Sequence, residues 1–414
     1  MGRPVAPANR PPTRSVHHLY VHVPFCRGRC DYCDFFSLAV DPGAAAGAQL
    51  LDRYLDALLA ELELERQRLG LRRLRTVFLG GGTPSLLGVP RLERLLRALE
   101  PLLTPAAEVT VETNPEDVDS AYAAWAAGRG LRVSLGVQSF DRDLRRTLGR
   151  STAADPLAAM ALLREAGCAN RGVDLIYGIP TQDMAALARD LAVVCHLRPE
   201  HVSWYELSVE PGTPLATRLA DGDVERGARS TERGDDGEGA ADRAAEMQRA
   251  IVRRLERAGY RWYEVSNYAL AGRQCRHNSA VWRGEQYVGL GPAAVSTLGE
   301  HRRRNLPDVE QYLRVLAWPA GGASAGAPPR EEEVLSAPVR ARERLLLAAR
   351  TGARVPLTEV APVLERAAVP SLVRAGLVGE AGGTLWITRK GRMVANAVCV
   401  RLFRDSYVKG TTCR

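Results

Sequence analysis

The sequence predicts an α/β protein in which a large domain with a parallel sheet precedes a smaller, winged-helix-like domain. Two observations lead to this fold class. Short runs rich in β-branched residues alternate six times with longer amphipathic stretches, and strands joined by such helical crossovers run parallel, in an open sheet or in a barrel. A chain of 414 residues, 46% of them hydrophobic, is also long enough to bury one large core and a second, smaller one.

Six segments are predicted as the parallel strands because they are short, apolar and bounded by turn-forming residues. They are His18–Val23, Thr76–Leu79, Val109–Glu112, Arg132–Val137, Val173–Tyr177 and Val202–Leu207. The segments between them have helical periodicity; in 50–69 one face is formed by Leu51, Leu55, Leu58, Leu59 and Leu62. In either arrangement of such a sheet, the loops that follow the strands meet at one end, and the chemistry is expected there.

Shifts in composition divide the rest of the chain. Residues 1–17 are basic and rich in proline and are predicted to be a disordered tail, and 18–218 form the parallel-sheet domain. Residues 219–242 contain Gly, Arg and Asp with almost no apolar side chains, which predicts a mobile insertion before a helix at 244–258. After a further segment, 243–319, the stretch 320–333 is predicted to be a linker, and 334–414 has the helix, helix, hairpin order of a winged helix, with the second helix near 357–375.

Charge and cysteine content restrict the class of protein. The net charge of +8 comes from arginines dispersed among acidic residues, without a polybasic block, so nucleic acid is not favoured as a partner. The N-terminus lacks the apolar region of a secretory signal, and no window approaches the run of about 18 apolar residues that spans a bilayer. Eight cysteines are too few for a disulfide framework in a chain of this length. We therefore expect a cytoplasmic protein without a transmembrane segment, whose thiols stay reduced.

Three cysteines, Cys26, Cys30 and Cys33, lie in one polar loop after the first strand. A structural zinc site normally has four ligands, so zinc would need His17 or His22 as well. Three thiolates on a four-iron cluster instead leave one iron free to bind something else. The sequence favours the iron-sulfur cluster.

Polar or glycine-rich loops follow the other strands. In "GGGTPS", 80–85, the lysine of a phosphate-binding loop is missing, and three glycines would let the backbone itself approach a ligand. Glu112 ends the third strand, directly before "TNPED", where Asn114 is expected to cap a helix and a carboxylate can accept hydrogen bonds from ribose hydroxyls. Gln138, Arg150 and Asp174 lie at or near successive strand ends.

Taken together, the motifs resemble those of radical S-adenosylmethionine (SAM) proteins. The resemblance is greatest to the branch that holds oxygen-independent coproporphyrinogen III oxidase and its heme chaperone relatives. It runs from about Leu19 to the C-terminus and is carried by "YVHVPFC", "GGGTPS", "LGVQSF", "DLIYGIP", "GYRWYEVSNYA", "CRHNSAVW" and "YVGLGP". It implies a partial (β/α)6 barrel of the TIM type.

The resemblance also implies a set of site residues. Cys26, Cys30 and Cys33 would hold a 4Fe-4S cluster whose free iron binds the methionine end of SAM. Residues around the cluster and cofactor would be Tyr20, Tyr32, Gly81, Gly82, Thr83, Glu112, Gln138, Arg150 and Asp174. A catalytic residue is not assigned.

One position favours the chaperone branch. The oxidases resemble Cys-x3-Cys-x2-Cys-x-Cys, and the fourth cysteine is replaced here by Phe35. The segment "HNSAVW" resembles the HNxxYW motif that is associated with heme handling in the chaperones, with Val281 in place of Tyr. His277 is thereby a candidate heme ligand, with Cys275 as its rival, Trp282 and Tyr287 as apolar surface and Arg276 or Arg283 as a partner for a propionate. The alternative for His277 is a histidine that hydrogen-bonds inside a buried segment.

The expected function is therefore heme chaperone, with heme as cargo. Its expected partners are apo-heme proteins, among them membrane-bound respiratory components, and an electron-donor protein. The alternatives are the oxidase activity itself, which Phe35 disfavours, and a metal-stabilised nucleic-acid-binding module. Two further departures from the family pattern, Thr152 and Val295 in place of histidines, concern substrate or heme handling more than the cluster site.

Overall fold

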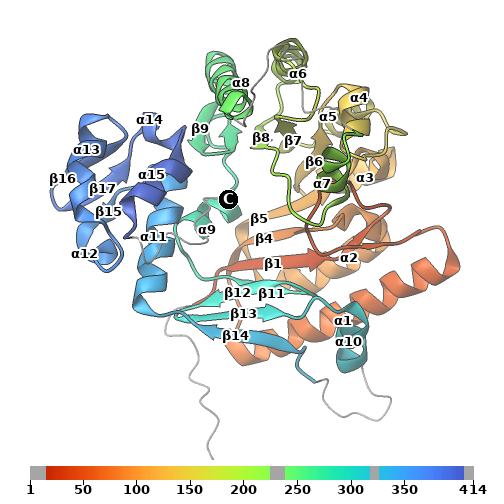
Figure 1. Ribbon diagram of the computed structural model, residues 1–414. Coiled ribbons are helices and arrows are strands. Elements are labelled where there is room, and N and C mark those ends of the chain that lie inside the picture. The colour runs from red at the N-terminus through yellow and green to blue at the C-terminus, as the bar shows by residue number, and fades with distance from the viewer. Residues whose placement is uncertain (1–14, 224–237, 318–325, 405–414) are drawn as a thin grey trace, which may run out of the picture.

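The protein is described by a computed structural model that covers residues 15–223, 238–317 and 326–404 (Figure 1). Its centre is a nine-stranded sheet in the order β11-β1-β4-β5-β6-β7-β8-β10-β9. The strands are β1 (His18–Val23), β4 (Leu74–Gly81), β5 (Leu103–Thr113), β6 (Arg132–Gln138), β7 (Arg171–Tyr177), β8 (His201–Glu206), β9 (Arg261–Glu264), β10 (Asn267–Ala269) and β11 (Val288–Leu290). The run from β11 to β8 is parallel, and β10 and β9 continue it antiparallel. The predicted α/β class with a mostly parallel sheet is confirmed.

Alternation along the strands separates an apolar face from a polar one. Fully buried residues such as Val21, Leu79 and Leu135 pack with the helices in one large core. That layer is formed by α1 (Ala45–Leu69), α2 (Gly88–Leu99), α3 (Ser120–Gly128), α5 (Pro156–Glu165), α6 (Met184–Leu197) and α8 (Glu238–Arg257). The residues between them in sequence, Tyr20 beside Phe78 and Glu112 beside Ser134, share the opposite face by register. This polar face is where the predicted site residues gather.

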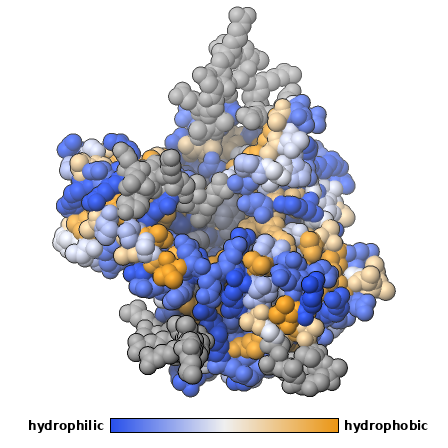
Figure 2. Space-filling view, turned by 60° about the horizontal axis from the view of Figure 1, so that its bottom comes forward, coloured by the Kyte–Doolittle hydropathy of each residue, from blue (hydrophilic) through white to orange (hydrophobic). Residues whose placement is uncertain are grey.

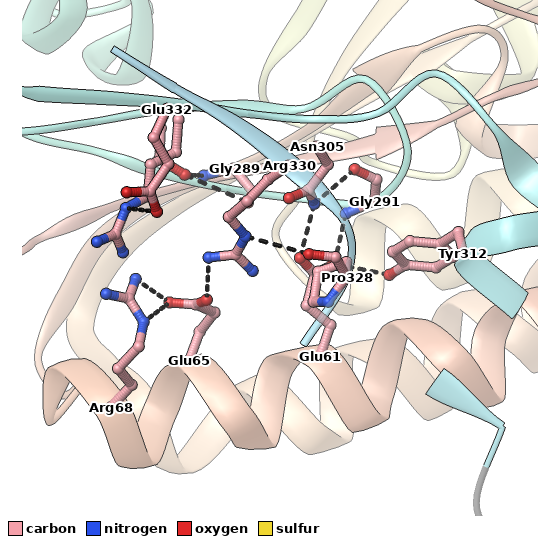
Figure 3. Close-up of polar contacts among 12 residues, drawn as sticks. Glu61, Glu65, Arg68, Gly289, Gly291, Asn305, Tyr312, Pro328, Arg330 and Glu332 are labelled. Atoms are coloured by element: carbon pink, nitrogen blue, oxygen red, sulfur yellow. Dashed lines mark hydrogen bonds and ion pairs between the residues drawn. The ribbon is translucent and has the colours of Figure 1, made fainter. Parts of the chain in front are cut away.

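A second, three-stranded sheet and the segments next to it are held to α1 by hydrogen bonds to the buried carboxylate of Glu61. It is formed by β12 (Val295–Leu298), β13 (His301–Asn305) and β14 (Arg330–Val334), and α10 (Val309–Leu316) follows β13. Glu61 on α1 accepts hydrogen bonds from the backbone N–H of Gly291 (2.7 Å), from Asn305 Nδ2 (2.7 Å) and from Tyr312 Oη (2.6 Å), as Figure 3 shows. Because burial raises the pKa of Glu61, these three donors are needed to stabilise its carboxylate there.

The predicted linker 320–333 differs from the structure at its end. Residues from Arg330 on form β14, in which Glu331, Glu332 and Glu333 lie opposite the arginines of β13. The complementary charges explain why this polar, glycine-poor end of the segment pairs as a strand. Residues 318–325 lie outside the described part of the chain.

The C-terminal region has a hydrophobic core of its own, built around Leu345, Leu372 and Leu385. Its elements are α11 (Ala337–Thr351), β15 (Val355–Pro356), α12 (Leu357–Val360), α13 (Val369–Arg374), β16 (Val378–Ala381), β17 (Thr384–Ile387), α14 (Arg389–Arg392) and α15 (Ala395–Leu402). The helix expected over 357–375 is broken into α12 and α13, because Pro362 follows α12 and Pro370 lies in the first turn of α13. Figure 1 shows these elements, in blue, at one side of the main sheet.

Two predicted segments lie mostly outside the described residues. Of the tail 1–17 the structure describes only Ser15, Val16 and His17; Val16 is buried, and His17 Nδ1 bonds to the carbonyl of Arg73. Of the insertion 219–242, the first residues end α7 (Pro214–Ala220) and the last belong to α8. The visible face in Figure 2 is mostly hydrophilic, with separate apolar patches.

Candidate functional site

The cysteine loop is closed at its base by two short strands. β2 (Phe25–Cys26) pairs in parallel with β3 (Leu38–Ala39), so the loop leaves and rejoins the end of β1 at one point. Within it, the N–H of Cys33 donates to the carbonyl of Cys30 (3.2 Å), which makes a tight turn. Cys26, Cys30 and Cys33 are free thiols, and each is partly exposed. The loop therefore presents three thiols at the carboxyl end of the sheet.

Donors are directed at two of these sulfurs. Thr83 Oγ1 lies 3.5 Å from Cys26 Sγ, and Arg150 Nη1 lies 3.6 Å from Cys30 Sγ. Burial raises the pKa of Cys26 and raises that of Cys33 to about 11, so these thiols need a bound positive centre to ionise. Hydrogen bonds to sulfur are a feature of iron-sulfur sites, and the arrangement fits such a cluster.

The zinc alternative finds no support in the geometry. His22 lies beside the loop, but its Nδ1 bonds to Tyr20 Oη (3.1 Å) and its Nε2 to the carbonyl of Phe36 (2.9 Å). His17 lies at the other end of β1. In the described part of the chain, no three His, Cys, Asp or Glu side chains gather around the position of a single metal ion. Thiolates that each bind a different iron of a cluster need no such common point.

The glycine-rich loop is explained by close approach of two strand ends. The N–H of Gly82 donates to the carbonyl of Val23 (2.8 Å), and that of Thr83 to the carbonyl of Phe25 (2.7 Å). A Cβ on Gly82 would lie 2.6 Å from the Phe25 oxygen, and Gly81 has a φ of +107°. A side chain at either position would push the loop away from the cysteines.

Two carboxyl groups, on β5 and β7, influence each other's charge on the polar face. Glu112 accepts from the N–H of Gly81 (3.3 Å), and Asp174 accepts from Ser134 Oγ (2.9 Å). Burial, and secondly the charge of Asp174, raise the pKa of Glu112 to about 8. Burial also raises the pKa of Asp174. At neutral pH one of the two carboxyl groups is therefore protonated in a large share of the molecules, so the pair can both donate and accept hydrogen bonds.

Arg150 links the cysteine loop to the strand ends. Its Nη2 donates to Asn114 Oδ1 (2.6 Å) and to the carbonyl of Gly136 (2.5 Å). Gln138, which follows in β6, has a φ of +68°, and its amide lies near the same point over Gly136. Together with Arg27, Arg29 and Arg145, Arg150 lines a cavity of about 320 Å³ that also borders Cys30.

Asn114 is a site residue that the sequence reading missed. It was expected to cap a helix, but its side chain makes no capping bond. Instead, Nδ2 donates to Thr83 Oγ1 (3.1 Å) while Oδ1 accepts from Arg150. Its position two residues after Glu112, at a strand end, was the signal that it shares the site.

The two tyrosines of the predicted site pack against different neighbours. Tyr20 stacks on Phe78 with ring centroids 6.3 Å apart, on the polar face of the sheet. Tyr32 packs against an apolar cluster that contains Leu148 and Leu215, and the pKa of its hydroxyl is raised mainly by burial. The structure thus places the predicted residues in the cysteine loop, at or after strand ends, and, for Tyr20 and Asp174, within strands of the main sheet.

The predicted heme residues do not form one surface. His277, on α9 (Arg276–Trp282), is buried with 4% exposure, so the expectation of an accessible ligand is wrong. Its Nδ1 bonds to Thr76 Oγ1 (2.9 Å), and its ring lies 5.3 Å from that of Phe78, inside the sheet. Arg276, Trp282 and Arg283 line a separate cavity of about 570 Å³, whereas Tyr287 forms a bridge with Thr297.

Comparison with known proteins gives the family. Residues 20–193 match the model of the radical SAM superfamily. The chain is 37% identical over 384 residues to the heme chaperone HemW of Mycobacterium tuberculosis (strain ATCC 25618 / H37Rv), which covers 92% of this chain and 93% of the relative. The chain belongs to the HemW family of radical SAM proteins.

Other members of the HemW family match over at least two thirds of this chain. The heme chaperone HemW of Bacillus subtilis (strain 168) is 29% identical over 92% of this chain and 97% of its own length, and that of Escherichia coli (strain K12) is 34% identical over 70% and 71%. Among solved structures, the coproporphyrinogen III oxidase HemN of Escherichia coli superposes with a TM-score of 0.75 over 95% of this chain and 91% of that one. At 22% identity the last match shows a shared fold.

Membership of a radical SAM family implies SAM and a 4Fe-4S cluster as cofactors. The described helices of this HemW family member include none with the length and apolar character needed to cross a membrane.

Proposed function

We propose that this protein is a heme chaperone, which binds heme and delivers it to apo-proteins. The observation that carries the proposal is the 37% identity to a heme chaperone over nearly the whole of both chains. A second supports it: Phe35, at the position of the extra cysteine expected in the oxidases, is 63% exposed and adds no thiol to the loop.

The cluster would be held by Cys26, Cys30 and Cys33. Thr83 would donate to the sulfur of Cys26 and Arg150 to that of Cys30. When bound, such a cluster supplies an electron to SAM. The chain would orient that cofactor with Tyr20, Tyr32, Gly81, Gly82, Glu112, Gln138 and Asp174, which lie in the cysteine loop, at strand ends or within strands of the main sheet. The protonated member of the Glu112 and Asp174 pair would donate a hydrogen bond there, and the ionised member would accept one.

Replacing any one cluster cysteine tests this assignment. Cys26→Ala, Cys30→Ala or Cys33→Ala should each reduce bound iron and sulfide to a small fraction of the wild-type content, because each thiolate binds a different iron. Cys195→Ala, a partly buried cysteine on α6, is the matched control and should keep the full content. Wild-type iron and sulfide in any of the three loop variants would refute the assignment.

For heme we propose His277 as the axial ligand, with Cys275 as the weaker candidate. Burial raises the pKa of Cys275 to about 12, and its Sγ is directed at Glu108 Oε1 (3.7 Å), so this thiol resists ionisation. His277 is buried too, but burial lowers its pKa to about 3, and a neutral imidazole is the form that ligates iron.

A heme titration followed by the Soret absorption tests the function. The wild-type protein should bind one heme per chain at micromolar concentration, and His277→Ala should shift the Soret band and weaken binding about tenfold or more. His196→Ala, an exposed histidine on α6, is the control. No heme binding by the wild-type protein would overturn the chaperone proposal, and unchanged spectra in His277→Ala would overturn the ligand.

The alternative function is the oxidase reaction, which the fold shared with HemN favours. The reconstituted protein with SAM and a reductant should leave coproporphyrinogen III unchanged. Formation of protoporphyrinogen IX with multiple turnovers would assign the chain to the oxidases instead. As partners we propose apo-heme proteins, including membrane-bound respiratory components, and a protein electron donor; as location, the cytoplasm.

A further inference from the structure

The buried histidines differ in how many ring nitrogens the protein occupies. In His18, Nδ1 bonds to Thr76 Oγ1 (2.8 Å) and Nε2 to Glu285 Oε2 (3.0 Å). In His22 both nitrogens are likewise engaged. In His277, Nδ1 bonds to Thr76 Oγ1, and within the described residues no hydrogen bond is made by Nε2. His277 therefore has a nitrogen that is left for another ligand, whereas His18 and His22 do not; among the described residues such a nitrogen is also left in the buried His201, whose Nε2 bonds to Tyr263 Oη (2.7 Å).

Hydrogen bonds connect Glu285 to His18, His18 to Thr76 and Thr76 to His277, and the protonation of each group follows in turn from that of Glu285. Although partial burial opposes ionisation, hydrogen bonds from Arg283 and His18 keep the pKa of Glu285 below its usual range. Burial lowers the pKa of His18, so its ring is neutral at pH 7. A neutral imidazole with Nε2 at 3.0 Å from a carboxylate oxygen carries its proton on that nitrogen, because two lone pairs would repel.

The position of that one proton decides the others. His18 Nδ1 has no proton, so it accepts from the hydroxyl of Thr76, whose single proton is then used. The Thr76 oxygen accepts the remaining bond, and Nδ1 of His277 must donate it. A neutral His277 with its proton on Nδ1 has its lone pair on Nε2.

We infer that Glu285, His18 and Thr76 are positioning residues that hold His277 in the tautomer whose Nε2 binds heme iron. The inference rests on the proposed heme function for its ligand, but the tautomer itself is a property of the protein without heme. Histidines that bind metals are commonly fixed through the hydrogen bond of the other ring nitrogen. Here the group that fixes His277 is the hydroxyl of Thr76. The direction in which this hydroxyl donates is set by the carboxylate of Glu285, which acts through His18.

The first experiment reads the tautomer directly. In full-length protein labelled with 15N-histidine and free of heme, the ring nitrogen shifts of His277 should show Nδ1 protonated and Nε2 not. Thr76→Val keeps the shape of the side chain but removes the hydroxyl, so the proton should move to Nε2, the preferred site of a free neutral imidazole. Thr76→Ser should restore the wild-type pattern. Thr110→Val is the matched control, since Thr110 is a buried threonine on the neighbouring strand whose hydroxyl has no partner among the described residues.

The second experiment links the tautomer to heme. Thr76→Val should weaken heme binding about tenfold or more, as is typical when the partner of a ligating histidine is lost, and Thr76→Ser and Thr110→Val should bind like the wild type. An unprotonated Nε2 in Thr76→Val, or a changed tautomer with undiminished heme affinity, would overturn the inference. If the wild type binds no heme, the proposed function fails, and the shifts in Thr76→Val and Thr76→Ser still decide whether Thr76 fixes the tautomer.

Discussion

At the scale of single residues, the buried carboxyl group of Glu112 makes stability depend on pH. Its folded pKa of about 8 lies above the ordinary value of 4.5. Between these values the folded chain keeps a proton that the unfolded chain has released, so stability is greatest at low pH within this window and falls as pH rises toward 8.

The first prediction concerns this pH dependence. From pH 6.5 to 8, the free energy of unfolding should fall with a contribution from Glu112 of up to about 1.4 kcal/mol per pH unit, less where solvent reaches the group. Chemical denaturation without SAM, at several pH values, measures it. His277 contributes with the opposite sign, mainly below about pH 7, because burial lowers its pKa to about 3 in the folded chain.

Glu112→Gln provides the comparison. The amide does not titrate, so the variant should lose this part of the slope and should bind SAM more weakly. An equally steep pH profile in Glu112→Gln would show that another group, with Asp174 the nearest, is responsible.

At the scale of elements, the end of β4 is held against β1 and β2 so closely that it leaves no room for a Cβ. Gly82→Ala would place a methyl group 2.6 Å from the backbone oxygen of Phe25 and 2.9 Å from that of Val23. Both residues belong to the segment that leads into Cys26. We expect a loss of about 1–3 kcal/mol in stability and a reduced iron content before any SAM is added. Gly28→Ala is the matched control in the cysteine loop, since a Cβ there would meet nothing within 4 Å. Full iron content in Gly82→Ala would contradict this account.

Helix α1 fixes the second sheet through Glu61. Glu61→Leu should cost at least about 3 kcal/mol, because the N–H of Gly291 and the side chains of Asn305 and Tyr312 would lose a charged acceptor in the core. Glu63→Leu, an exposed position on the same helix, should change stability by less than about 0.5 kcal/mol. Thermal unfolding of both variants measures the difference; equal melting temperatures would show that the network is dispensable.

The elements also show what the sequence was able to predict. β1 matches its predicted bounds, and the other five parallel strands were placed correctly because hydrophobic patterning is local. β11 and β14 were missed since each is stabilised by distant partners, β1 and β13. For the site, the cysteine spacing and the strand ends indicated which loops come together, the resemblance to radical SAM proteins supplied the individual residues, and their roles stay predictions. The inward turn of His277 depends on Thr76 and Phe78 and has no local signal.

At the scale of the whole molecule, the C-terminal region is joined to the main sheet by a buried ion pair. Arg350 on α11 reaches Glu264 on β9 at 2.9 Å, and the Glu264 side chain is fully buried. Arg350→Met should cost about 3–5 kcal/mol, because it leaves that carboxylate without its cation. Arg389→Met is the matched control; its pair with Glu256 also joins the two regions but is exposed and should contribute less than about 1 kcal/mol. Limited proteolysis and chemical denaturation distinguish the two, and equal losses would contradict the prediction.

The pairing of β1 with β11 can form only late in synthesis. The first strand leaves the ribosome early with its cysteines, yet the segment at Val288–Leu290 that covers its outer edge is translated much later. At about 5–20 residues per second, the apolar edge of β1 stays unpaired for roughly 15 to 50 s. During that interval the nascent chain carries an open strand edge and three free cysteine thiols together, so misfolding by edge pairing and oxidation of the thiols both have to be avoided before the second half of the chain is made.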